Sequence, residues 1–84
     1  LMKSMAVELG PKNIRVNMVS PSMTETELLS RVPQRQVKVA AQQNPMRRLG
    51  LPDDIAKAIT FLCSSDASYV NGHNLIVSGG SAML

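Results

Sequence analysis

With 84 residues the chain is long enough for one small domain at most, and such a domain buries only about 60% of its unfolded surface. The net charge of +3 comes from basic residues spread along the sequence with no interleaved aromatic side chains, which argues against nucleic-acid binding. The sequence contains no signal peptide pattern and no apolar run of membrane-spanning length, so we expect a cytoplasmic protein without a membrane partner.

The first segment, residues 1–9, has apolar residues at helical spacing and is predicted to be the last turns of a helix. Gly10 stands where a left-handed residue ends many helices, and Pro11 follows as a helix stop. Because the sequence starts with Leu1 and in the middle of this pattern, we expect a piece of a longer protein.

The next segment, residues 14–21, alternates apolar side chains with Arg15 and Asn17 and predicts a short strand. Pro21 is expected to end the strand pairing because it has no N–H to donate. A turn rich in serine and threonine follows at residues 22–26. In an open α/β sheet, ligands bind outside the carboxyl ends of the strands, so this turn is the candidate site.

The middle of the chain predicts two short helices, at residues 25–30 and 34–43, interrupted by Pro33. They carry few large apolar side chains and bury little area, which is typical of a mobile lid over a site. The alternative is a connector that merely spans the sheet.

A longer helix is predicted from Pro52 to Ser64, with Asp53 and Asp54 in its first turn. Its apolar residues form a wide stripe, so we expect burial on most of its surface, including the thiol of Cys63. The last predicted strand is residues 73–78, which Gly79 and Gly80 end.

The two strands are separated by a long helical crossover and should therefore lie parallel, in a right-handed βαβ unit. A two-stranded parallel sheet is a poor independent structure, because its strands need neighbours and helices on both faces. The expected fold class is α/β, and the chain is expected to be the terminal section of a larger doubly wound sheet.

Four stretches of the chain form a recognisable series: Met5-Ala6-Val7-Glu8-Leu9-Gly10, Ile14-Arg15-Val16-Asn17-Met18-Val19-Ser20-Pro21, Met46-Arg47-Arg48-Leu49-Gly50 with Pro52-Asp53-Asp54-Ile55-Ala56, and Tyr69-Val70-Asn71-Gly72. In this order they resemble the C-terminal third of a short-chain dehydrogenase/reductase, with carbonyl and 3-oxoacyl-carrier-protein reductases as the most similar subgroup. The resemblance implies that residues 1–84 are the C-terminal βαβ part of a single NAD(P)-binding Rossmann-like domain, in which the two strands are the sixth and the seventh.

The resemblance also implies hydride transfer between NADP or NAD and a small carbonyl or alcohol substrate. The family's Pro-Gly-x-x-x-Thr turn matches residues 21–26 and implies cofactor binding by Pro21, Ser22, Thr24 and Thr26. Alternatively, Thr26 simply caps the helix that follows. Ser22 stands where the family usually has glycine, so its backbone is expected to be more restricted.

No catalytic residue is assigned in this chain, because the family's catalytic Ser, Tyr and Lys belong to upstream segments. Tyr69 has no lysine four residues later, and His73 opens a strand without a catalytic partner. One cysteine and one histidine are too few ligands for a metal site. The 84-residue piece alone is therefore expected to be inactive.

Two alternatives to an enzyme segment stay open. One is a non-catalytic assembly element, in which the helix at 52–64 and the strand at 73–78 pair with a second copy in a homodimer or homotetramer. The other is a pseudo-enzyme relative that has lost its catalytic residues.

Overall fold

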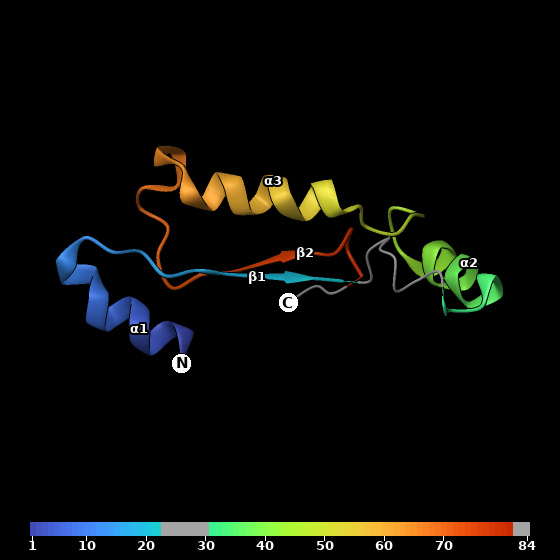
Figure 1. Ribbon diagram of the computed structural model, residues 1–84, viewed down its shortest axis with the longest axis horizontal. Helices are drawn as coiled ribbons and strands as arrows, with labels where there is room; N and C mark the ends of the chain where they lie inside the picture. The colour runs from blue at the N-terminus through green and yellow to red at the C-terminus, as the bar shows by residue number, and fades with distance from the viewer. Residues whose placement is uncertain (23–30, 82–84) are drawn as a thin grey trace.

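The computed structural model describes residues 1–22 and 31–81, and Figure 1 shows their arrangement. Two strands lie side by side, with helix α3 along one side and helix α1 on the other in this view, while α2 lies beyond the carboxyl ends of the strands. The elements are α1 (Met2–Leu9), the 3-10 turn η1 (Gly10–Lys12), β1 (Met18–Pro21), α2 (Gln34–Gln43), α3 (Pro52–Cys63), the 3-10 turn η3 (Ser65–Ala67) and β2 (Asn74–Val77). The predicted helix at 34–43 is confirmed, and the helix predicted at 25–30 lies outside the described residues.

The predicted parallel pairing is also confirmed: β1 pairs with β2 in one sheet, with Met18 opposite Asn74 and Pro21 opposite Val77. Both strands are shorter than predicted, because β1 begins only at Met18 and β2 only at Asn74.

The prediction that Pro21 ends the pairing was wrong. Pro21 belongs to β1, and the ladder continues beyond it, since the Ser22 N–H donates to the Val77 carbonyl at 3.2 Å. Met18 and Ser22 are an even number of residues apart and donate toward β2, so the nitrogen of Pro21 faces the opposite edge. A proline at that position costs no hydrogen bond to β2.

Gly10 does not take the left-handed conformation that was predicted for it. Its φ of −52° and ψ of −48° continue the turn as η1, and Asn13 adopts the left-handed conformation instead, with φ 61°. Asparagine tolerates this conformation better than most residues. The chain therefore leaves α1 one short turn later than the sequence pattern indicated.

Two asparagine side chains connect the chain segments at the amino ends of the strands. Asn71 accepts from the Val16 N–H at 2.9 Å and donates to the Ala6 carbonyl at 3.1 Å. Asn17 donates to the Val70 carbonyl at 2.9 Å and accepts from the His73 N–H at 3.0 Å. Before the strands begin, these side-chain bonds join the two segments as backbone hydrogen bonds join them in a sheet. They therefore set the register of β1 against β2.

Helix α3 begins at Pro52, as predicted, and its first turn is capped by a carboxylate. Asp54 accepts from the Leu51 N–H at 2.8 Å and forms an ion pair with Arg48, also at 2.8 Å. The hydrogen bond from Arg48 and then the one from Leu51 lower the pKa of Asp54 below its ordinary value. The loop before α3 is thereby tied to the helix start.

The core of the described residues is small. Its buried apolar side chains are Ala6, Leu62 and Ala67, and no large side chain is fully buried in this part of the chain. The radius of gyration is 15.5 Å, whereas a compact domain of this length has about 12 Å. The described structure is thus extended and leaves much apolar surface uncovered.

The expected burial of α3 on most of its surface was wrong for the described structure. Leu62 is buried, but Ile59 is 48% exposed and Phe61 45% exposed, and Cys63 is an exposed thiol. One helix resting on two strands can cover only one narrow stripe of its own surface. In the same part of the chain, no helix has both the length and the apolar content to cross a membrane.

The role of Asn71 gives a first prediction. In the full-length protein, the substitution Asn71→Asp keeps the acceptor for Val16 but removes the donor to Ala6. We expect a loss of about 1 kcal/mol in the free energy of unfolding by urea, the typical effect of one lost hydrogen bond. Gln42→Glu is the matched control, because it makes the same change of charge on an exposed side chain of α2. Equal stability of the two variants would contradict this role.

The cap of α3 gives a second prediction. A lowered pKa in the folded state means that Asp54 contributes stability above its unfolded pKa, and that this contribution is lost as the pH falls through the folded value. The stability difference between native protein and Asp54→Asn should therefore be constant near neutral pH and shrink below about pH 4. Asp53→Asn is the control, since Asp53 pairs with Lys57 but does not cap Leu51. A difference that stays constant into acid would contradict the cap.

Candidate functional site

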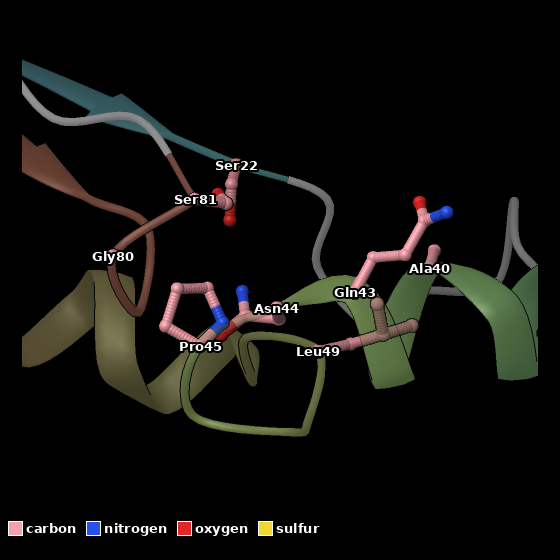
Figure 2. Close-up of a pocket in the computed structure, with 8 residues that line it drawn as sticks. All are labelled: Ser22, Ala40, Gln43, Asn44, Pro45, Leu49, Gly80 and Ser81. Carbon is pink, nitrogen blue, oxygen red and sulfur yellow. The ribbon is translucent and has the colours of Figure 1, made fainter.

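The candidate site lies where three chain segments meet at the carboxyl ends of β1 and β2. Ser22 follows β1, residues 78–81 follow β2, and the loop between α2 and α3 reaches them through Asn44 and Pro45 (Figure 2). In the close-up, Asn44 and Pro45 lie between the turn at Gly80 and the end of α2 at Gln43. This is the edge of the sheet at which the sequence predicted the site.

The carbonyl oxygen of Ser78 is the common hydrogen-bond acceptor of these segments. It accepts from the Asn44 side-chain amide at 2.8 Å, and from the Ser81 hydroxyl and N–H at 3.0 and 3.2 Å. The Ser22 hydroxyl donates to it at 3.5 Å, a long and weak contact. A carbonyl oxygen has only two lone pairs for these donors, so the shortest hydrogen bond, the one from Asn44, is expected to be the strongest.

Asn44 is a buried polar residue whose side-chain nitrogen and oxygen both form hydrogen bonds. Its residue is 7% exposed, and its side-chain oxygen accepts from the Met46 N–H at 2.8 Å. A buried polar group without such partners would be costly, so the two bonds fix the side chain in one orientation. Asn44 therefore joins the α2–α3 loop to the turn after β2.

The two glycines after β2 make room for this contact. Gly79 has φ 62°, and a Cβ there would lie 2.6 Å from the side-chain oxygen of Asn44. Gly80 has φ 94°, and its Cβ would lie 3.1 Å from the ring of Pro45. The glycine pair thus serves two needs, a left-handed turn and a close approach of the loop.

Two cavities flank Asn44, and both are also lined by Ser22. The first, of about 410 Å³, is the one drawn in Figure 2 and has a mixed lining that includes Ala40, Leu49 and Ser81. The second, of about 320 Å³, is lined in part by Val77 and by Arg48 and Asp54. Such volumes at the carboxyl edge of a parallel sheet suit a small polar ligand with one apolar face.

The second cavity carries opposite charges that neutralise one another. The hydrogen bond and charge of Asp54 raise the pKa of Arg48 above its ordinary value, and those of Asp53 raise the pKa of Lys57. Both cations already have carboxylate partners, at 2.8 and 3.0 Å. The ion pairs therefore shape the wall of the cavity and do not present an unpaired cation to a ligand.

The four residues predicted to bind a cofactor fall into three groups. Ser22 is half-buried and lines both cavities, whereas Pro21 is exposed and lines neither. Thr24 and Thr26 lie outside the described residues. Ser22 does not have a positive φ, since the non-glycine residues with positive φ in the described ranges are Asn13 and Arg47, so the position does not require a glycine.

Sequence reasoning missed Asn44, Pro45 and Ser81. The sequence pattern assigns no role to Asn44 and Pro45, and it indicates only the end of a strand at Gly79-Gly80. A pair of glycines directly after a strand was the available signal, because it marks a close approach by another segment. Tyr69, to which no catalytic role was assigned, has a fully exposed side chain. In the described ranges, no group of three His, Cys, Asp or Glu side chains could hold a metal ion.

Comparisons with known proteins agree on one family. Residues 1–82 match the family model described as "Enoyl-(Acyl carrier protein) reductase". The chain is 50% identical over 82 residues to a 7alpha-hydroxysteroid dehydrogenase of Escherichia coli K12, covering 95% of this chain and 32% of the relative. It is 43% identical over 83 residues to the mouse dehydrogenase/reductase SDR family member 4, covering 96% of this chain and 30% of the relative.

Solved structures agree with this result. A short-chain dehydrogenase/reductase from Brucella melitensis superimposes with a TM-score of 0.91 at 41% identity, covering 99% of this chain and 34% of that one. A 3-oxoacyl-[acyl-carrier protein] reductase from the same organism gives a TM-score of 0.93 at 35% identity, covering 99% and 31%. The chain spans about a third of the length of the relatives it matches. With a family model that matches nearly all of its residues, the chain belongs to the short-chain dehydrogenase/reductase family of oxidoreductases.

Proposed function

We propose that the full-length protein transfers a hydride between NADP or NAD and a small carbonyl or alcohol substrate, and that this segment forms one wall of the nicotinamide site. The observation that carries the proposal is the position of Ser22, which lines two cavities at the carboxyl edge of a parallel strand pair. In doubly wound sheets this edge is where ligands bind. Family membership supplies the class of reaction.

The segment is proposed to be the C-terminal third of a single NAD(P)-binding domain, with β1 and β2 as its sixth and seventh strands. The order and spacing of the four family-like stretches support this placement. The two-stranded sheet supports it too, because such a sheet needs further strands beside β1 to be stable.

The described residues fit a nicotinamide. The ring has an apolar face and one carboxamide, and the cavity in Figure 2 offers both kinds of surface, with Leu49, Ala40 and Pro45 beside the hydroxyls of Ser22 and Ser81. Ser22 would line the nicotinamide end of the cofactor. By the family resemblance alone, Pro21 would pack against the nicotinamide, and Thr24 and Thr26 would contact its carboxamide and the nearest phosphate.

When bound, the reduced cofactor would supply a hydride, a hydrogen nucleus with two electrons, for the carbonyl carbon. The proton for the carbonyl oxygen would come from residues upstream of this segment. The segment itself orients the ring and excludes water from it. Helix α2, which lies beyond the strand ends in Figure 1, is proposed to cover the substrate as a lid.

This proposal predicts that the full-length protein oxidises NADPH or NADH in the presence of a ketone. Relatives named as hydroxysteroid dehydrogenases and a 3-oxoacyl-carrier-protein reductase suggest a steroid ketone and a 3-oxoacyl thioester as first substrates. The 84-residue chain alone is expected to be inactive under the same conditions. Loss of reduced-cofactor absorbance measures both, and turnover by the short chain would contradict the assignment of the proton donor to upstream residues.

The complete reading frame tests the enzyme against the pseudo-enzyme alternative. We expect a Tyr-x-x-x-Lys sequence in the helix before Leu1. Replacing that tyrosine by phenylalanine should abolish turnover while cofactor binding persists. A full-length protein without this pair, and without turnover, would make the pseudo-enzyme the better description.

A second role, assembly into a homodimer or homotetramer, is supported by the apolar side chains that α3 leaves exposed. Ile59 and Phe61, on different sides of the helix, are 48% and 45% exposed, and exposed large apolar side chains are typical of a surface that another chain or segment covers. The relatives' family makes a two-fold symmetric neighbour a reasonable occupant.

The assembly role predicts that Phe61→Ser in the full-length protein lowers the molar mass measured by light scattering toward that of a monomer. Tyr69→Ser is the matched control. Tyr69 is aromatic like Phe61 and its side chain is fully exposed, but it lies outside α3. A native protein that is strictly monomeric, or two variants with the same mass as native, would contradict the role.

A further inference from the structure

The contacts of Asn44 single it out among the polar side chains of the candidate site. It lies 7% exposed between two cavities, outside any strand, and its amide bonds the Ser78 carbonyl on one side and the Met46 N–H on the other. The Met46 bond is local and would form in many turns. The Ser78 bond joins residues 34 positions apart and closes the loop onto the sheet.

We propose that Asn44 is the positioning residue of the cofactor site, a role that rests on the proposed hydride-transfer function. It acts through the Ser78 carbonyl, which also receives the hydroxyls of Ser22 and Ser81. By taking one lone pair of that oxygen, Asn44 fixes the turn after β2 against which Ser22 is placed. The wall shared by both cavities depends on this one amide.

The geometry explains why an amide is needed at this position. Asparagine presents a donor to Ser78 and an acceptor to Met46 at the same time, both at 2.8 Å. Aspartate would keep the acceptor but place a carboxylate against the Ser78 carbonyl. Leucine has the same branching but is larger, and it would lose both bonds.

The glycine at position 79 makes the contact possible from the other side. A Cβ at Gly79 would lie 2.6 Å from the Asn44 side-chain oxygen, so alanine there should push the amide away while Asn44 itself is intact. Gly72 is the matched comparison. Its φ of 71° is close to the 62° of Gly79, but a Cβ there meets its nearest neighbour, Ala6, at an ordinary 3.5 Å.

The test is the dissociation constant of NADPH or NADH for the full-length protein, measured by the fluorescence of the reduced cofactor. Asn44→Asp should weaken binding about tenfold, as expected when a buried hydrogen bond becomes a repulsive contact. Asn13→Asp makes the same chemical change on an exposed side chain that lines neither cavity, and it should leave the dissociation constant within about twofold. In steady-state kinetics, Asn44→Asp should raise the KM for cofactor more than the KM for the carbonyl substrate.

The glycine pair keeps the test decisive if Asn44→Asp folds poorly. Gly79→Ala should weaken cofactor binding, whereas Gly72→Ala should lower the melting temperature with native affinity. If Asn44→Asp and Gly79→Ala melt earlier but bind cofactor as native protein does, the positioning role is wrong and the proposed function stands. If native protein itself binds neither NADPH nor NADH, the proposed function fails and the positioning role with it.

Discussion

The hydrogen bond from the Asn44 amide to the Ser78 carbonyl is the contact on which the site depends. Helix α2 and the loop after it have few other contacts with the strand pair. The buried apolar side chains of the described residues lie elsewhere, in α1, in α3 and in the turn after α3. At the amino ends of the strands Asn17 and Asn71 serve the same purpose. Three asparagines thus hold together a structure that lacks a large core of its own.

Polar contacts are needed to connect the chain segments because apolar packing is incomplete. Phe61 and Ile59 remain half exposed on α3, and β1 has a single neighbour in the described sheet. Side-chain amides that bond backbone groups fix register and turn geometry without requiring a deep core. The remaining apolar surface is where the rest of the proposed domain, and a second copy, would pack.

Much of the fold could be predicted from the sequence, because it follows from local patterns. The bounds of α2, the proline start of α3 and the parallel pairing all come from periodicity, caps and the length of the crossover. The errors arose where a distant contact decides. Gly10 yields the left-handed position to Asn13, and Pro21 stays paired because its nitrogen faces away from β2. Ser22 could be predicted as a site residue from a family turn. The Gly79-Gly80 pair indicates that another segment approaches closely, but it does not identify Asn44, because Asn44 and Ser78 lie 34 residues apart in the sequence.

Hydrogen–deuterium exchange of the full-length protein, with and without NADPH, shows whether cofactor binds at the carboxyl edge of this strand pair. We expect slower exchange at residues 20–22, 44–46 and 78–81, with residues 70–73 at the amino edge unchanged. Protection at the amino edge, or none at the carboxyl edge while NADPH is bound, would rule out cofactor binding at this site.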